Sequence, residues 1–298
     1  MNRITVKAYG KLNLGLEILG RDERGYHDLR MVMQSVGVFD LLTITEEGQG
    51  LRLTCDDPGV PADETNLVLK CARKLLEETG RPQTGLTFHL EKHLPMEAGM
   101  AGGSADGAAA LAGLNALLKL NLSQQQLCHI GVQLGADIPF CLTGGTQLVE
   151  GIGEKLTPLP EYTAGAFLIG KPIAGVSTKA AFAAYDALEE KPRLGEEFER
   201  LLEGVKQNDP VETAAHLINA LEPVCGVPEV ELLGQRMLKA GALGARMTGS
   251  GSAVYGIFPT LKEAQEQLES VSHLPFSAAV RPVNRGVEIL PQENDKIE

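Results

Sequence analysis

The stretch Leu94-Pro-Met-Glu-Ala-Gly-Met-Ala-Gly-Gly-Ser-Ala-Asp106 carries the strongest local signal in the chain. A strand is predicted over residues 86–90, and an alanine- and leucine-rich helix is predicted from Ser104 to about Lys119. Small residues let backbone N–H groups approach a ligand closely, and a helix N-terminus adds unpaired donors and the positive end of its dipole. The stretch predicts either a phosphate-binding loop or a plain glycine turn before a packing helix, and composition alone leaves both open.

Several common catalytic motifs are absent from the sequence around this loop and elsewhere. No Gly-Lys-Ser/Thr closes the loop, so it is not a Walker A motif, and the chain contains neither His-Arg-Asp nor Asp-Phe-Gly, which mark protein kinases. Ser104 lies in no Gly-x-Ser-x-Gly sequence, so a serine hydrolase lacks its main support.

The composition is that of a globular chain with an acidic balance. The chain has 298 residues, with 27 Lys and Arg against 39 Asp and Glu, which gives a formal net charge of -12. Such a charge argues against binding along a nucleic-acid backbone, which needs clustered cations. The five cysteines are widely spaced, and we expect no disulfide framework or zinc ribbon. The N-terminus does not resemble a signal peptide and no transmembrane helix is expected, so the sequence predicts a cytoplasmic protein with no membrane partner.

The pattern of predicted elements indicates an α+β protein with two domains. In the first half, short strands are expected at residues 4–6, 13–19, 36–38, 41–45 and 51–54, and helices at residues 65–79 and from Ser123 to Gly135. The pattern changes near Pro158–Pro160, so we expect domains at residues 1–159 and 160–298. A strand–strand–helix–strand order after residue 244 favours an antiparallel sheet with helices on one face, and the tail Gln292–Glu298 is expected to fray.

Asp137 is a candidate general base. It lies in Gly135-Ala-Asp-Ile-Pro-Phe140, just beyond a predicted helix end, where the helix dipole disfavours its charge. A short turn between apolar residues would also desolvate it in part, and both effects suit a proton acceptor. An ordinary turn aspartate before a proline is the alternative.

Lys11 is a candidate cation on a predicted strand. Leu12, Leu14 and Leu16 alternate toward one face, while Lys11 and Asn13 point toward the other. A cation at that place could pair with a catalytic carboxylate or a phosphate, and a solvent-exposed strand lysine is the alternative.

Two further segments could contribute to a site. Gly25-Tyr-His-Asp28 offers a stacking face and a hydrogen-bonding tip to an aromatic base, or it is surface decoration. Thr248-Gly-Ser-Gly-Ser252 is a turn of small residues that could approach a phosphate or the first glycine loop, or it is a tight hairpin turn.

Taken together and in order, these segments resemble the GHMP kinase superfamily over nearly the whole chain. The matching segments are Ala8–Leu16, Arg24–Leu29, Asn66–Val68, Lys92–Asp106, Leu134–Phe140, Glu150–Glu154 and Met247–Gly251. The Gly-Tyr-His and Gly-Ala-Asp-Ile-Pro pieces are typical of those members that act on a cytidine diphosphate sugar alcohol in isoprenoid precursor biosynthesis. The resemblance implies an S5-like N-terminal domain and a ferredoxin-like C-terminal domain.

The resemblance also implies roles for individual residues. Asp137 would be the catalytic base, with Lys11 as its charge partner. The ATP phosphates would be held by the loop Pro95, Met96, Glu97, Ala98, Gly99, Met100, Ala101, Gly102, Gly103, Ser104 and Ala105, with Asn66 and Lys92 near the nucleotide. The cytidine substrate would be bound by Asn13, Tyr26, His27 and Phe182. Mg²⁺ would accompany ATP, with no metal ligand assigned.

Two residues depart from the usual pattern of the superfamily. Ala105 replaces a hydroxyl residue, which removes one possible oxygen contact to phosphate or metal. Glu97 replaces a small residue, and because its carboxylate would repel phosphates we expect it to turn outward or to reach a cation.

The sequence thus leads to the hypothesis of an ATP-dependent kinase that phosphorylates an alcohol of a cytidine diphosphate compound, as a monomer or homodimer. Another kinase of the superfamily, acting on mevalonate, homoserine or a sugar, is the alternative enzyme. A non-catalytic nucleotide-binding homologue is the alternative from another class, motivated by Ala105 and Glu97.

Overall fold

A computed structural model describes residues 2–23 and 25–291. Arg24, the first residue of the matching segment Arg24–Leu29, and the tail Gln292–Glu298, which is predicted to fray, therefore lie outside the described residues. No helix in the described ranges is both long enough and apolar enough to cross a membrane.

The first layer is a mixed β-sheet, which in the described part of the chain has eight strands. Five of them follow the order β12-β1-β2-β4-β3, β5 and β6 extend from β2, and β8 pairs with β1. Their bounds are Arg3–Arg21 for β1, His27–Glu46 for β2, Leu51–Cys55 for β3, Leu86–Glu91 for β4, Thr146–Gly151 for β5, Lys155–Pro158 for β6, Ile218–Asn219 for β8 and Val287–Ile289 for β12.

β1 and β2 correct the expectation of four short strands at residues 4–6, 13–19, 36–38 and 41–45. They form one long antiparallel pair, with register shifts after Tyr9, Asn13 and Ile18. Such irregularities let a strand bend while its pairing continues, so the glycines inside β1 do not end it. β5 and β6 form a hairpin that was not predicted from the sequence.

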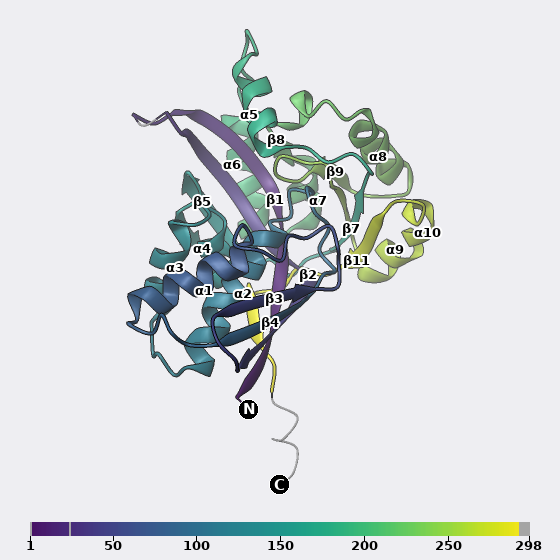
Figure 1. Cartoon of the computed structure of the whole chain (residues 1–298). Helices are drawn as coiled ribbons and strands as arrows, with labels where there is room; N and C mark the ends of the chain where they lie inside the picture. The colour runs from purple at the N-terminus through teal and green to yellow at the C-terminus, as the bar shows by residue number, and fades with distance from the viewer. Residues whose placement is uncertain (1, 24, 292–298) are drawn as a thin grey trace.

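Four helices lie on one side of the long β1–β2 pair (Figure 1). They are α1 Leu67–Glu78, α2 Gly102–Leu117, α3 Gln124–Val132 and α4 Ile138–Thr143. The helices α1, α2 and α4 pack on the sheet, and α3 packs on these three helices. The helix predicted from Ser123 is confirmed, and Ser123 and Gln126 form a capping box at the start of α3. α2 begins at Gly102 rather than Ser104, because Ala101 takes a left-handed conformation with φ of 60° and ends the loop there. Most of α2 is buried and apolar, so it packs as the central helix of this layer.

The second sheet lies on the other side of β1 and β2, together with α8, α9 and α10 (Figure 1). Its order is β11-β7-β10-β9, with every pair antiparallel, as the element order predicted. The strands are β7 Ala166–Lys171, β9 Gly244–Met247, β10 Val254–Phe258 and β11 Phe276–Val280. The remaining helices are α5 Thr178–Asp186, α6 Gly195–Lys206, α7 Pro210–Ala215, the 3₁₀ turn η1 Glu222–Val224, α8 Pro228–Lys239, α9 Leu261–Glu266 and α10 Leu268–Val271. The α+β class is confirmed.

The chain returns twice from the second half to the first sheet. β8 pairs in parallel with β1 through Gly15 and Leu16, and β12 pairs with Val6, Lys7 and Ala8 on the same strand. These two strands of the second half thus share hydrogen bonds with β1, which also carries Lys11 and Asn13. The division at residues 1–159 and 160–298 stays a prediction.

Candidate active site

One cavity, of about 700 Å³, brings together segments from both halves of the chain. From the first half it is lined by Lys11, Asn13, Lys92, the loop from Pro95 to Ser104, and Asp137. From the second half it is lined by Val176–Thr178, Phe182 and Gly249–Gly251. The two turns of small residues and the two candidate catalytic side chains therefore share one cavity.

The loop from Pro95 to Ala101 owes its shape to left-handed residues. Glu97, Gly99 and Ala101 have φ of 48°, 71° and 60°, and the chain then enters α2. Loops that alternate between right- and left-handed residues turn successive N–H groups toward one side, and the first N–H groups of a helix have no partner within it. The loop can therefore present backbone donors to an anion at the positive end of the α2 dipole.

The Thr248–Ser252 turn packs directly on this loop. The N–H groups of Ser252 and Ala253 donate to the carbonyl oxygens of Glu97 and Ala98, at 3.2 and 3.3 Å. A Cβ atom on Gly99 would overlap the carbonyl of Thr248, so only glycine fits this contact. The second turn of small residues thus supports the first from the opposite half of the chain.

Lys11 and Asn13 lie side by side in the cavity on β1. Lys11 Nζ donates to Asn13 Oδ1 and, at 2.7 Å, to the carbonyl oxygen of Gly99. The Asn13 backbone donates to Thr248 Oγ1 at 2.9 Å, and its carbonyl accepts from the Tyr255 hydroxyl at 2.9 Å. Lys11 is 3 % exposed, so it is not a solvent-exposed strand lysine. Burial lowers the pKa of Lys11, against the opposing fields of Asp137 and Cys141.

Leu16 corrects the expected alternation of β1. The register shift between Asn13 and Gly15 changes which face the following side chains take, so Leu16 lines the cavity together with Lys11 and Asn13. Leu12 and Leu14 are buried in the core, as expected.

Asp137 lies at the beginning of α4, where it is the N-cap residue and half-buried. We expected Asp137 to lie beside the carboxyl end of a helix, and this expectation is wrong. The preceding helix, α3, already ends at Val132, and the helix nearest to Asp137 is α4, at whose amino end it lies. Its side chain makes no capping hydrogen bond and lines the cavity instead. The carboxylate is thus placed to meet a ligand rather than to satisfy the helix.

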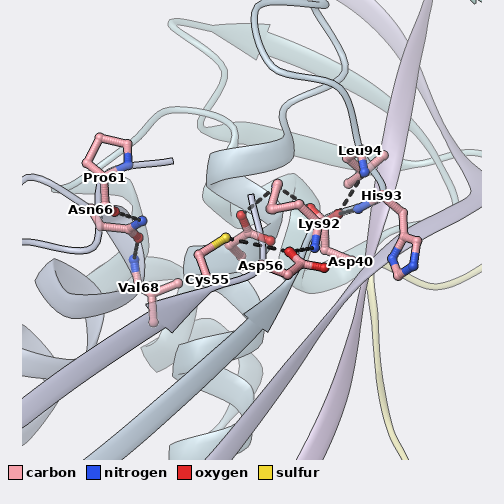
Figure 2. Close-up of polar contacts among 10 residues, drawn as sticks. Asp40, Cys55, Asp56, Pro61, Asn66, Val68, Lys92, His93 and Leu94 are labelled. Carbon is pink, nitrogen blue, oxygen red and sulfur yellow. Dashed lines mark hydrogen bonds and ion pairs between the residues drawn. The ribbon is translucent and has the colours of Figure 1, made fainter. Parts of the chain in front are cut away.

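Lys92 and Asn66 have structural partners (Figure 2). Lys92 Nζ donates to Asp40 and, at 2.8 Å, to Asp106 Oδ2. Asn66 caps α1: its Oδ1 accepts from Val68 N at 2.9 Å and its Nδ2 donates to the Pro61 carbonyl at 2.7 Å. Lys92 lines the cavity, whereas Asn66 is not among the described residues that line it.

The residues expected at the cytidine site lie around the β1–β2 hairpin and α5. His27 and Phe182 stack with ring centroids 4.4 Å apart and planes 24° apart. His27 Nε2 also lies 2.9 Å from Asp186 Oδ1, and the same carboxylate bonds Arg21. The hydrogen bond with His27 lowers the pKa of Asp186. Phe182 lines the cavity, whereas His27 and Tyr26 are not among the described residues that line it, and Tyr26 is 59 % exposed.

The two departures from the superfamily pattern have different surroundings. Ala105 is fully buried within α2 and does not line the cavity in the described structure, so a hydroxyl is not missing from the cavity wall at this position. Glu97 is exposed, and a Cβ on Gly175 would overlap its Oε2. Burial lowers the pKa of Lys171, and the field of Glu97 opposes that effect. The Glu97 carboxylate thus lies against Gly175 in the second half of the chain, and its field reaches Lys171.

Several lining residues were not found from the sequence. Apolar side chains form part of the wall, among them Leu29, Met31 and Met33 of β2, Leu67 of α1 and Leu221. Met31 and Met33 alternate on β2, and Met33 pairs with Asn13 across the strands. This alternation would have predicted Met31 and Met33 as lining residues if β2 had been recognised as the partner strand of β1.

A metal ion would need oxygen donors at the loop. Within residues 2–23 and 25–291, no group of three or more His, Cys, Asp and Glu side chains is arranged to hold a metal ion. Mg²⁺ bound with a nucleotide needs only one or two protein ligands, because phosphate oxygens and waters supply the rest. Ser104 lines the cavity at the start of α2 and offers a hydroxyl oxygen, so it fits a site of this kind for Mg²⁺.

Comparison with known proteins identifies the family. The family models described as GHMP kinases N terminal domain and GHMP kinases C terminal match residues 66–145 and 194–275. The 4-diphosphocytidyl-2-C-methyl-D-erythritol kinase of Clostridium botulinum (strain Eklund 17B / Type B) is 37% identical over 270 residues, which are 90% of this chain and 95% of that relative. The kinase of the same name from Caldicellulosiruptor bescii is 42% identical over 256 residues, or 85% of this chain and 88% of that relative.

Solved structures agree with this assignment. A crystal structure of 4-(cytidine 5'-diphospho)-2C-methyl-D-erythritol kinase matches with a TM-score of 0.78 and 30% identity, and covers 93% of this chain and 98% of that chain. A homoserine kinase from Cytophaga hutchinsonii has the same TM-score of 0.78 at 22% identity, which shows a shared fold alone. The chain therefore belongs to the GHMP kinases, and within them to the family of 4-diphosphocytidyl-2-C-methyl-D-erythritol kinases.

Proposed function

We propose that the chain transfers the γ-phosphoryl group of ATP to the 2-hydroxyl of 4-diphosphocytidyl-2-C-methyl-D-erythritol, a step of isoprenoid precursor synthesis by the non-mevalonate pathway. The observation that carries the proposal is the shared cavity, in which Lys11, Asp137 and a loop at a helix N-terminus meet. Relatives of that name that match about nine-tenths of the chain support the choice of substrate.

Asp137 is the proposed base. Its carboxylate accepts the proton of the 2-hydroxyl as that oxygen forms a bond to the γ-phosphorus and the bond from phosphorus to the leaving ADP oxygen breaks. The half-buried N-cap position without a capping bond leaves the carboxylate available for this proton. Lys11 contributes a positive charge beside the reaction, held in place by Asn13 and the Gly99 carbonyl.

The loop and the α2 N-terminus are the proposed phosphate site. Backbone donors at a helix N-terminus stabilise negative charge where it develops, and positioning together with electrostatics supplies most of the catalysis in phosphoryl transfer. Mg²⁺, when bound with ATP, would neutralise phosphate charge, and the Ser104 hydroxyl is the protein oxygen proposed to hold it. Asn13 and Phe182, which line the cavity, are proposed to bind the cytidine diphosphate part, with Phe182 as a stacking face. Tyr26 and His27 are proposed to bind the same part, and the stacking of His27 on Phe182 supports this for His27.

An ADP-release assay with the cytidine substrate, mevalonate and homoserine side by side tests the proposal. We expect turnover with the cytidine compound and none above background with the others. CDP should raise the melting temperature of the protein, because a ligand that binds only the folded state stabilises it. Turnover with mevalonate or homoserine and no stabilisation by CDP would assign the chain to another kinase of the superfamily.

Replacing the proposed base gives a sharper test. Asp137→Asn should lower kcat by about 10²- to 10⁴-fold, because proton transfer to a positioned side chain contributes that much. The melting temperature and the shift produced by CDP should stay close to those of the wild type. Asp209→Asn is the matched control, since Asp209 is also the N-cap of a short helix but is not among the lining residues. Retained turnover in Asp137→Asn would refute the assignment of the base.

A further inference from the structure

Three ionisable side chains form a buried cluster beneath the phosphate loop. Asp40 of β2, Lys92 just after β4 and Asp106 of α2 have side-chain exposures of 0, 5 and 5 %. Lys92 Nζ bonds Asp40 Oδ2 (Figure 2) and, at the same time, Asp106 Oδ2. Burial lowers the pKa of Lys92, but the interactions with Asp106 and Asp40 outweigh it and raise the pKa, so the ammonium stays charged. Burying charge is costly, which makes the location of this cluster informative.

Asp40 holds the chain where it enters the loop. Its Oδ1 accepts the backbone N–H groups of His93 and Leu94 at 2.6 and 2.7 Å, the two residues directly before Pro95 (Figure 2). The Lys92 N–H donates to Asp56 Oδ1 at 2.8 Å. Asp40 of β2 and Asp56, the residue after β3, therefore fix the backbone of the loop entrance on two sides.

Asp106 holds the other end of the loop. It lies in the first turns of α2, which begins at Gly102 directly after the loop. One ammonium group thus joins the entrance of the loop, through Asp40, to the helix at its exit, through Asp106. A Cβ at Gly102 would lie 3.4 Å from Lys92 Nζ, so the ammonium lies directly against the start of the helix.

We propose that Asp40 and Asp106 are positioning residues, which hold the Lys92 ammonium under the loop and so fix the distance between the loop entrance and the α2 N-terminus for nucleotide binding. This positioning role rests on the proposed function, in which the loop binds the phosphates of ATP. Neither carboxylate is among the lining residues of the cavity, so both act through Lys92 and the loop backbone. Small misplacements of binding groups are costly, which makes the effect measurable.

Calorimetric titration with Mg·ATP and, separately, with CDP tests the proposal on the folded full-length chain. Asp40→Asn removes the charge that holds Lys92, and Asp106→Ala removes the second anchor in an alanine-rich helix that accepts alanine well. Each should weaken ATP binding by about tenfold or more, while the Kd for CDP changes by less than about twofold. Asp106→Asn keeps an oxygen acceptor for Lys92 and should restore most of the ATP affinity that Asp106→Ala loses.

Glu46→Gln is the matched control, since it makes the same carboxylate-to-amide change at the exposed end of β2. It should leave both affinities unchanged. ATP affinity within about twofold of the wild type in Asp40→Asn and Asp106→Ala would overturn the proposal, as would an equal loss of ATP and CDP binding. If Asp40→Asn fails to fold, the ATP affinities of Asp106→Ala and Asp106→Asn test the proposal by themselves. A wild type that binds ATP but does not phosphorylate the cytidine compound would refute the substrate and leave this proposal standing.

Discussion

At the scale of single residues, Asp106 connects the buried cluster to the pH dependence of stability. Burial and the neighbouring Asp40 raise the pKa of Asp106 to about 8, although Lys92 opposes them, from the ordinary value of 3.8. Between these values the folded chain binds a proton that the unfolded chain has lost, so the free energy of unfolding falls as the pH rises. The stability that this proton contributes is fully present below the pKa of Asp106 in the unfolded chain. It is lost as the pH rises through the pKa of Asp106 in the folded chain.

Asp106→Asn removes that titration, because an amide has no proton to lose. We expect the stability of Asp106→Asn relative to the wild type to increase from about pH 5 to about pH 8. Urea unfolding of both proteins at a series of pH values measures it. Parallel stability curves for the two proteins would show that Asp106 titrates in the folded state as it does in the unfolded chain.

Gly99 is the residue where the two halves of the site meet most closely. Its φ is 71°, and a Cβ there would overlap the carbonyl of Thr248. Gly80 has a φ of 69° with open space around it, so Gly80→Ala measures the cost of the left-handed conformation alone, about 1–2 kcal/mol. Gly99→Ala should cost about 1–3 kcal/mol more, because it also overpacks the contact.

Urea unfolding of the two glycine variants and titration with Mg·ATP check this comparison. We expect Gly99→Ala alone to weaken ATP binding, since the loop must shift to accept the methyl group. Equal losses of stability in the two variants would mean that the loop and the Thr248 turn separate at little cost.

At the scale of elements, the helices were more predictable than the strands. Local residues mark where three helices begin. Asn66 is the N-cap of α1, Ser123 and Gln126 form the capping box of α3, and Pro228 lies in the first turn of α8. β1 and β2 could not be predicted at full length, because their register shifts depend on cross-strand pairing and leave no local mark. β12 is short, and only its pairing with β1 defines it.

The same distinction applies to the site. The segments near the cavity could be found because glycine loops and the Gly-Ala-Asp-Ile-Pro turn are distinctive in sequence. Asp40 could not be found, since its partner Lys92 lies 52 residues away and only the β2–β4 pairing brings them together. Asn66 was predicted near the nucleotide, whereas the structure gives it a capping role in α1 and leaves the nucleotide role untested.

Substitution of Asn66 separates the capping role from a nucleotide role. Asn66→Ala should lower the free energy of unfolding by about 1 kcal/mol, because it removes the acceptor for the Val68 N–H. Asn66→Asp keeps that acceptor and should restore most of the loss. Urea unfolding gives the stabilities and titration with Mg·ATP gives the affinities. Weaker ATP binding in both variants, with stability lost only in Asn66→Ala, would support a direct contact with the nucleotide.

At the scale of the whole molecule, the two halves of the chain share hydrogen bonds at the site itself. Asn13 of β1 receives a hydrogen bond from Tyr255 and donates one to Thr248, both at 2.9 Å. β8 and β12 complete the first sheet with strands from the second half. The active-site cavity lies where these connections cross, so its walls depend on both halves being folded.

We therefore expect the full chain to unfold in one cooperative transition, although the sequence predicts two domains. Scanning calorimetry should give a van't Hoff enthalpy close to the calorimetric enthalpy, and CDP should move the whole transition to higher temperature. A fragment of residues 1–159 would lack β8 and β12, so β1 would keep β2 as its one remaining partner strand among the described residues. We expect that this fragment does not fold alone. Two separate calorimetric transitions, only one of them shifted by CDP, would instead mean that the halves are independent and that the cavity wall from the second half forms after folding.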